Sequence, residues 1–166
     1  MSDSLVIRSA DQDDIATIGY LAHQIWPVAY QQILSSDQLQ YMLKMMYSPA
    51  ALEKQILELG HRFIIAEIDL EEVGFAAFNP VTPSVWKLQK LYVLPQLQGK
   101  GIGRALLDMV EEEVRTRQGA HLILNVNKLN PAIKFYSSMG FQIEKEEVID
   151  IGQGYLMDDY VMGKDI

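Results

Sequence analysis

A glycine-rich segment, Gln98–Gly103, holds the residues best suited to bind a ligand through the main chain. It contains Gly99, Gly101 and Gly103, and glycine adopts positive φ angles and lets a ligand approach the backbone closely. An apolar run ending at Pro95 precedes the segment and helix-spaced apolar residues follow it, so we expect it to join a strand to a helix. Free N–H groups and the helix dipole would then point into the turn. This arrangement favours a phosphate or diphosphate.

The spacing of the glycines excludes two common nucleotide-binding turns. A dinucleotide fingerprint needs Gly-x-Gly-x-x-Gly, whereas the order here is Gly-x-Gly-x-Gly, and no acidic residue ends a second strand at the expected distance. A P-loop needs Gly-Lys followed by Ser or Thr, but Lys100 is followed by Gly101. A turn that merely starts a helix remains an alternative for this segment taken alone.

Two motifs resemble those of the GNAT N-acetyltransferases. The order Gln98-x-x-Gly101-x-Gly103 after a strand ending in Val-x-Pro is similar to the family's acyl-CoA signature. The segment Asn130–Phe141 is similar to the family's Asn-x-x-Ala-x-x-Phe-Tyr-x-x-x-Gly-Phe element, and the opening residues from Ile7 to Asp13 are also family-like. Two motifs in the right order are far more specific than either alone, and the resemblance covers most of the chain.

The resemblance implies a fold and a cofactor. We expect an α/β fold of mixed α+β type, with a mixed, mostly antiparallel sheet of about seven strands flanked by helices. Its fourth and fifth strands would splay apart and hold the pantetheine arm of acetyl-CoA, the co-substrate. The amide of Val93 would then donate to the thioester oxygen. The cofactor-binding residues implied are Leu91, Tyr92, Val93, Gln98, Gly99, Lys100, Gly101, Ile102, Gly103, Arg104, Asn130, Ala132, Phe135 and Tyr136. For Lys100 and Arg104, an ordinary exposed position at a helix start is an equal alternative.

Tyr136 is the residue that the resemblance assigns to catalysis. It occupies the family's tyrosine position, and a phenol of pKa about 10 can give its proton to a thiolate whose acid has a pKa of about 8.5. The alternative is a core tyrosine, since Phe135 is adjacent and both rings could pack. Asn130 should cap the helix that carries Tyr136, and Asn125 and Asn127 are polar positions on an apolar strand that need partners.

The general base is not assigned by the sequence. The place where many family members carry a glutamate falls near Lys87, with Gln89 beside it, and neither is a carboxylate. Four residues or a chain of waters remain as candidates: His23, Glu67, Asp158 and Asp159. The chain has no cysteine and no Gly-x-Ser-x-Gly elbow, so we expect direct attack in a ternary complex. The three histidines share no metal-ligand spacing, so we expect no metal.

The acceptor site should be shaped by the N-terminal helices. Trp26 and Tyr30, with Asn125, are its candidate residues, whereas core packing is the better interpretation of Met42, Met45 and Met46. This layout and the tail Tyr155–Asp159 are somewhat similar to polyamine N-acetyltransferases, although the missing strand carboxylates count against that acceptor. Alternatives to an amine acetyltransferase are a non-catalytic acyl-CoA sensor and a protein or peptide N-acetyltransferase.

Composition sets the class of protein. The chain of 166 residues fits a single domain, residues 1–166. Its net charge of −8 and lack of a basic patch argue against nucleic acid. No apolar run reaches membrane-spanning length, and Met1–Ser4 lacks the features of a signal peptide, so we expect a cytoplasmic enzyme without membrane contact. A homodimer through the C-terminal strands is an option that no sequence feature tests.

The candidate site residues must be positioned by a series of helices and strands that the sequence predicts. Capping and periodicity predict, in order, one strand, three helices, three strands, one helix, one strand, one helix and two strands. The first helix should end at Trp26-Pro27, because proline disfavours a helical residue before it. The expected later segments are strands 62–68, 73–79, 85–94, 122–126, 141–149 and 154–162, a long helix to about Gln118 that ends at Gly119, and a helix between Asn130 and Gly140.

Overall fold

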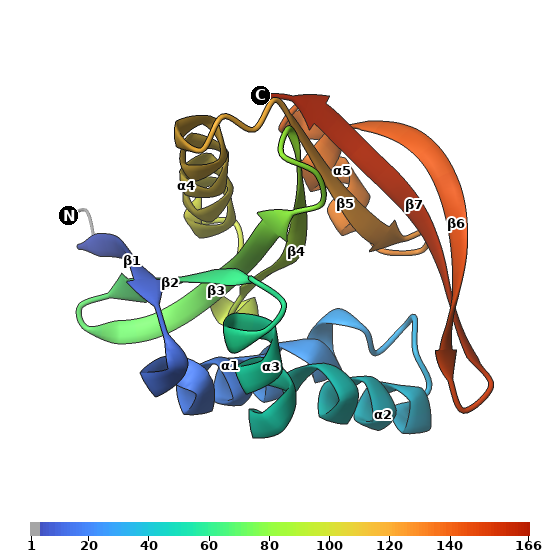
Figure 1. Cartoon of the computed structure of the whole chain (residues 1–166). Helices are drawn as coiled ribbons and strands as arrows, with labels where there is room; N and C mark the ends of the chain where they lie inside the picture. The colour runs from blue at the N-terminus through green and yellow to red at the C-terminus, as the bar shows by residue number, and fades with distance from the viewer. Residues whose placement is uncertain (1–3) are drawn as a thin grey trace.

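The computed structural model describes residues 4–166, and their strands form one seven-stranded sheet (Figure 1). The strands are β1 (Leu5–Ala10), β2 (Arg62–Ile68), β3 (Glu71–Pro80), β4 (Val85–Val93), β5 (His121–Asn127), β6 (Gln142–Gly152) and β7 (Tyr155–Asp165). The helices are α1 (Ile15–Ala29), α2 (Ser36–Tyr47), α3 (Pro49–Leu57), α4 (Ile102–Thr116) and α5 (Ala132–Ser138), with short 3-10 turns at Gln12–Asp14 and Pro95–Leu97.

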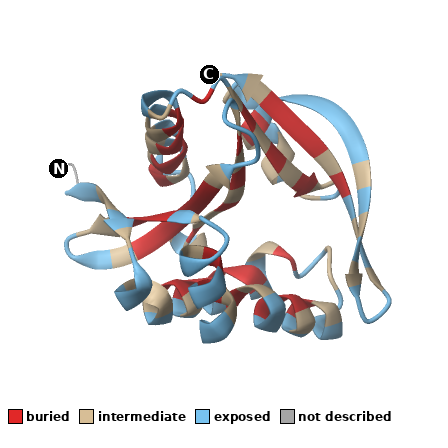
Figure 2. Cartoon of the chain, viewed as in Figure 1, coloured by how far each residue is buried: buried red, intermediate tan, exposed pale blue. Residues whose placement is uncertain are grey.

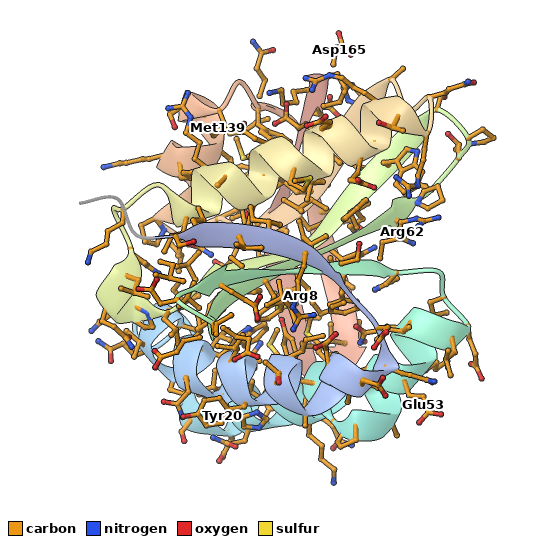
Figure 3. The ribbon with its side chains drawn as sticks, turned by 90° about the vertical axis from the view of Figure 1, so that its left-hand side faces the viewer. Arg8, Tyr20, Glu53, Arg62, Met139 and Asp165 are labelled. Atoms are coloured by element: carbon orange, nitrogen blue, oxygen red, sulfur yellow. The ribbon has the colours of Figure 1, made fainter. Side chains whose placement is uncertain are left out.

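The sheet has the order β1-β2-β3-β4-β5-β7-β6, with β4 and β5 parallel and every other pair antiparallel. Helices cover both faces, with α4 on one side and α1 on the other (Figure 3). One hydrophobic cluster joins α4 and α5 to the sheet, and a second joins α1, α2 and α3 to it. Figure 2 shows the buried residues on these inner faces, while the edge strand β6 is largely exposed. The expected fold class is confirmed.

Strands β4 and β5 separate after a short paired segment. Their register runs only from Val85↔His121 to Leu88↔Leu124. The pairing of β4 with β3 shifts directly after this segment. Phe78 faces Leu88 and the adjacent Ala77 faces Lys90, so Gln89 is an extra residue in β4. Such a bulge bends its strand and increases its twist, which turns the rest of β4 away from β5. The expected splay is therefore present, and the bulge is its local cause.

Most helix starts follow the signals in the sequence. The Ser35 hydroxyl accepts from the amide of Gln38 at 3.1 Å, and the Ser48 hydroxyl accepts from the amide of Ala51 at 3.2 Å. The predicted end of the first helix at Trp26-Pro27 is wrong, since α1 continues to Ala29. The backbone amide of Tyr30 donates to the carbonyl of Trp26 at 3.0 Å, so helical hydrogen bonding continues past Pro27. Burial of Ile25 and Trp26 offsets the hydrogen bond that proline removes.

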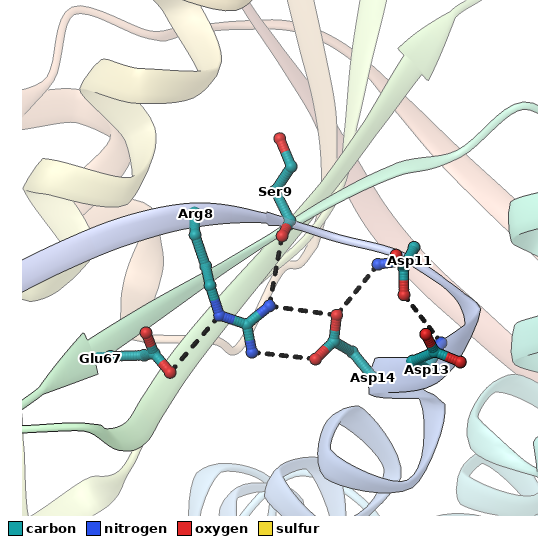
Figure 4. A network of polar contacts seen from close by, with 6 residues as sticks. All are labelled: Arg8, Ser9, Asp11, Asp13, Asp14 and Glu67. Carbon is teal, nitrogen blue, oxygen red and sulfur yellow. Dashed lines mark hydrogen bonds and ion pairs between the residues drawn. The ribbon is translucent and has the colours of Figure 1, made fainter.

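Arg8 fixes the corner between β1 and α1 (Figure 4). Its guanidinium donates to both carboxylate oxygens of Asp14 at 2.9 and 3.1 Å and lies 3.4 Å from Glu67 on β2. The hydrogen bonds from Arg8 lower the pKa of Asp14. The side chain of Asp11 caps the short turn Gln12–Asp14 between β1 and α1 by accepting from the amide of Asp13 at 2.8 Å. Glu67 thus takes part in a structural network.

His121 links three strands at the other end of the sheet and makes stability depend on pH. Its ring nitrogens lie 2.8 Å from Asp165 on β7 and 2.7 Å from Glu144 on β6. Burial lowers the pKa of His121, but the two hydrogen bonds outweigh it and the net pKa is raised. A raised folded pKa stabilises the fold fully below the unfolded value of about 6.5, and this contribution is lost as pH rises through the folded value.

We therefore expect His121→Gln to lower the melting temperature at about pH 5 and to have less effect at about pH 8. The effect should be small, because the Asp165 side chain is exposed. Thermal unfolding of both proteins across this range tests it. A difference that grows with rising pH would contradict the assignment.

Candidate functional site

A cleft of about 800 Å³ opens where β4 and β5 diverge. One end is lined by the glycine turn and by the start of α5, from Leu97 to Arg104 and from Asn130 to Tyr136. Its middle is lined by β4 and by the carboxyl end of β5, from Leu124 to Asn127. Its other end is lined by α1, α2 and the β6–β7 hairpin. A ligand in the cleft would therefore contact residues from both halves of the sheet.

The glycine turn presents unpaired backbone amides to the cleft. Gly99 and Gly101 have φ angles of 82° and 83°, and Gly101 is the N-cap of α4. Ala105 donates to the carbonyl of Gly101 at 3.0 Å, so the amides of residues 102–104 lie in the first helical turn and have no helical acceptor. These amides and the positive end of the α4 dipole suit a diphosphate. Only glycine takes the two positive φ angles without strain.

The open edge of β4 offers a further amide. The amide of Leu94 donates to the carbonyl of Val73 on β3 at 2.9 Å. Because successive amides of a strand point to opposite edges, the amide of Val93 points away from β3. That direction is the open edge, where β5 has already turned away. Val93 lines the cleft, so its N–H is free to bind an oxygen of a ligand there.

Tyr136 lies beside this edge, on α5. The N-cap position of α5 is Pro131, and the side chain of the preceding Asn130 accepts from the amide of Ala132 at 2.8 Å at the start of the helix. The Tyr136 ring is 9% exposed and packs edge-on against Phe135 and Phe141. Burial raises the pKa of Tyr136, so the hydroxyl is protonated at neutral pH. The residue both packs in the core and lines the cleft.

Aromatic residues form the floor of the far end. The Trp26 ring packs against the Tyr30 ring at a tilt of 45° with the ring centroids 4.6 Å apart, and the Tyr30 and Tyr92 hydroxyls are 2.8 Å apart. The two aromatic candidates for the acceptor site, Trp26 and Tyr30, thus line the cleft while remaining buried. Met42 is buried in the core as expected and lines the cleft as well, whereas Met45 is 40% exposed, so the core interpretation is wrong for Met45.

The β6–β7 hairpin and α2 meet and close this far end. The Tyr41 hydroxyl donates to the carbonyl of Ile151, and the side chain of Gln38 donates to the carbonyl of Leu156 at 3.4 Å. Figure 1 shows the hairpin tip beside α2, far from α5. Three hairpin residues that the sequence analysis did not identify therefore line the cleft: Ile149, Ile151 and Met157. The apolar alternation at 149 and 151 in an otherwise polar segment was the available signal.

The candidate bases separate clearly in space. His23 is exposed and its Nδ1 lies 2.7 Å from the carbonyl of Gly19. Glu67 is bound to Arg8, and Asp158 lies 3.0 Å from the Lys128 ammonium. Asp159 alone of the four lines the cleft. Lys87 and Gln89, near the position where many family members carry a glutamate, also line it, and Gln89 donates to the side chain of Asn79 at 3.0 Å.

Asp159 is buried, with 3% of its surface exposed. Its Oδ2 accepts from the side chain of Asn125 at 3.3 Å, which gives Asn125 its partner across β5 and β7. Its Oδ1 is buried and has no partner among the described residues. Burial raises the pKa of Asp159. Asn127, by contrast, accepts from the amide of Leu129 and shapes the loop before α5.

Lys90 is a buried lysine that no motif or spacing in the sequence singles out. It follows the bulge in β4, is 4% exposed, and donates to the side chain of Gln55 on α3 at 2.7 Å. Its ammonium also lies 5.5 Å from the ring centres of Tyr47 and Phe63. Burial lowers its pKa to about 7. Its amine is bound to Gln55 on α3, and the residue lines the cleft.

Of the expected cofactor-binding residues, Lys100 does not line the cleft. It is exposed between two glycines of positive φ, so a contact between Lys100 and the cofactor stays a prediction. The other residues of that set are brought together in one cleft. Among residues 4–166, no group of three acidic, histidine or cysteine side chains could hold a metal ion. In the same range, no helix is long and apolar enough to cross a membrane.

Comparison with known proteins gives consistent matches. The profile of the Acetyltransferase (GNAT) domain matches residues 59–143. An uncharacterized N-acetyltransferase, YjgM of Escherichia coli (strain K12), is 33% identical over 87 residues, which cover 50% of this chain and 52% of that protein. The chain therefore matches about half the length of this relative. Spermidine N(1)-acetyltransferase of Thermoplasma acidophilum is 25% identical over 160 residues, covering 93% of this chain and 96% of that protein.

The fold itself is shared with solved structures. The crystal structure of PaiA N-acetyltransferase from Thermoplasma acidophilum, in complex with coenzyme A, superposes with a TM-score of 0.85 at 24% identity. The superposition covers 98% of this chain and 99% of that chain. The resemblance found in the two sequence motifs thus extends to the whole described fold.

Proposed function

Because the chain belongs to the GNAT family of acetyl-CoA-dependent N-acetyltransferases, we propose that it acetylates a primary amine by direct attack in a ternary complex. The observation that carries this proposal is the placement of the glycine turn, the open edge of β4 and Tyr136 in one cleft. Residues from α1 and from β7 line the same cleft, so we propose residues 1–166 as one functional domain.

The cofactor would bind along the glycine-turn end of the cleft. The amides of residues 102–104 would hold the diphosphate, with Arg104 at the same turn adding positive charge. The pantetheine arm would run along Leu91–Val93 and pair with the open edge of β4, as an added strand does. This placement leads the thioester toward the middle of the cleft and leaves the far end for the acceptor.

The amide of Val93 would stabilise the thioester oxygen as it gains negative charge. A preorganised donor of this kind contributes about 3 kcal/mol to the transition state. Holding the amine against the thioester carbon supplies several more kcal/mol, on the order of 7 or above in favourable cases. Binding and orientation are therefore the larger share of the expected rate enhancement.

Tyr136 would protonate the departing sulfur. As the carbon–sulfur bond breaks, its electron pair remains on sulfur and the thiolate takes the hydroxyl proton. At neutral pH the Tyr136 hydroxyl carries its proton and can donate it when the thiolate forms. No acyl-enzyme is required, and the chain contains no cysteine to form one by thiol attack.

A free-thiol assay tests the proposed function. The purified chain is incubated with acetyl-CoA and a panel of amines and amino-terminal peptides, and release of coenzyme A is followed. We expect release with small primary amines, in line with the spermidine acetyltransferase among its relatives. Tight binding of coenzyme A without thiol release from any acceptor would instead support a non-catalytic sensor.

A further inference from the structure

The acceptor end of the cleft contains one buried carboxylate with an unused oxygen. Asp159 is held by Asn125 through Oδ2, while Oδ1 is buried without a partner. No ion pair formed by the described residues includes Asp159, whereas the neighbouring Asp158 points to the other face of β7 and pairs with Lys128. A buried acceptor left unpaired costs free energy, so this oxygen is poised to receive a donor from a ligand.

Asp159 is also the only carboxylate among the described residues that line the cleft. The other charged lining residues are the cations Lys87, Lys90 and Arg104. The remaining lining near Asp159 is mostly apolar or aromatic, with Asn125 and Gln89 as polar members, and its apolar members are Ile25, Ala29, Met42, Met45, Met46, Ile149, Ile151 and Met157. The site therefore offers a single negative charge within a hydrophobic enclosure.

On the basis of the proposed function, we propose that Asp159 binds the ammonium group of the acceptor and accepts its proton, and that the acceptor is an amine with one positive charge and an apolar body. This deepens the proposed function by naming a proton acceptor and a substrate class. It also separates this chain from its spermidine-acetylating relative, whose substrate is a polyamine.

The reaction balances with these two groups. The acceptor ammonium gives one proton to Asp159, and the neutral amine forms the carbon–nitrogen bond with the thioester carbonyl. The carbon–sulfur bond then breaks, and the thiolate takes the proton of Tyr136. The nitrogen, still carrying one proton more than the amide, returns it to the Tyr136 oxygen. Asp159 releases its proton to solvent, so the net products are the N-acetyl amine, coenzyme A and one proton.

A second positive charge would be poorly accommodated in this end of the cleft. Burying an unpaired ammonium among methionine and isoleucine side chains is strongly unfavourable. Lys87 adds like-charge repulsion from β4, and Asp159 can neutralise only one ammonium. An apolar body has the opposite preference, since it gains from each methylene group that it buries.

The groups around Asp159 set the pH at which it can act. Burial raises its pKa, Glu147 on β6 and the adjacent Asp158 raise it further, and Asn125 and Lys87 lower it. Tyr30, from the segment after α1, interacts electrostatically with it. Because the net pKa is raised, activity should fall as pH drops through this value and Asp159 becomes protonated. This acidic limb should disappear when the carboxylate is removed.

A matched pair of acceptors tests the substrate class. Hexylamine and 1,6-diaminohexane have the same carbon chain and differ by one terminal ammonium. We expect kcat/KM for hexylamine to exceed that for the diamine, and that for spermidine, by at least about tenfold. A preference for the diamine or for spermidine would overturn the inference while leaving the proposed function intact. Binding of coenzyme A with no thiol release from any amine would overturn both.

The variant Asp159→Asn tests the residue independently of the panel. We expect a loss of at least about tenfold in kcat/KM for hexylamine, loss of the acidic limb of the pH profile, and coenzyme A affinity within about twofold of wild type. The control Glu146→Gln removes an exposed carboxylate that pairs with Lys128 and should change none of these. If Asp159→Asn has the same kcat/KM for hexylamine and the same pH profile as the wild type, Asp159 takes no part in the reaction.

Discussion

The variant Gly103→Glu is expected to fold normally and to bind coenzyme A at least about a hundredfold more weakly than wild type. Gly103 lies in the first turn of α4 and lines the cleft. A β-carbon there would meet Phe135 at 3.8 Å and Val93 at 3.9 Å, which are ordinary contacts. The added carboxylate would stand where we propose that the diphosphate binds. Two unit charges about 4 Å apart repel by about 4 kcal/mol near a protein surface.

Gly103→Glu should therefore weaken coenzyme A binding without lowering the stability of the fold. Replacing a glycine within a helix stabilises it by up to about 1 kcal/mol, and a negative charge near a helix N-terminus contributes about 0.3–1 kcal/mol more. The control Thr116→Glu adds the same charge at the exposed C-terminal end of α4 and should leave coenzyme A binding unchanged. Calorimetric titration together with thermal unfolding provides both quantities. Unchanged affinity in a stable Gly103→Glu protein would exclude the turn as the diphosphate site.

The variant Tyr136→Phe is expected to lower kcat by at least about tenfold while leaving coenzyme A affinity nearly unchanged. Phenylalanine keeps the ring contacts with Phe135 and Phe141, so the fold and the cleft should persist. The lost hydroxyl is the group that we propose to protonate the thiolate. Water can replace it only partly, because Tyr136 is buried.

Single-turnover measurements are the appropriate readout for Tyr136→Phe, since slow product release would hide an effect on the chemical step. The control Tyr20→Phe removes a hydroxyl from an exposed ring on the outer face of α1 (Figure 3) and should have wild-type turnover. If Tyr136→Phe also has wild-type turnover, the tyrosine has only a packing role. The thiolate would then take its proton from another donor.

Locally encoded features were predictable from the sequence because their causes lie within a few residues. The caps at Ser35 and Ser48 and the bond from the Ala132 amide to Asn130 before α5 depend on near neighbours. The glycine turn depends on backbone freedom at fixed spacing. The end of α1 was mispredicted at Pro27 for the opposite reason. There the local preference of proline is overridden by burial of Ile25 and Trp26 against distant elements.

The proposed proton acceptor, Asp159, could not be singled out from the sequence because burial is a long-range property. Asp158 and Asp159 are adjacent, and neither neighbouring sequence nor composition distinguishes them. The pairing of β7 with β5 and β6 sends one side chain to Lys128 and the other to Asn125 in the cleft, since successive side chains of a strand point to opposite faces.

By itself, the sequence determined the order of the elements, the glycine turn, the tyrosine helix and the family, because each of these is set by residue types at short spacing. Tertiary structure alone decided how wide β4 and β5 open, which methionine and isoleucine side chains enclose the acceptor end, and which carboxylate is left with a free oxygen. These features arise where α2, β4 and the β6–β7 hairpin meet, and no short segment of the chain contains the contacts that create them.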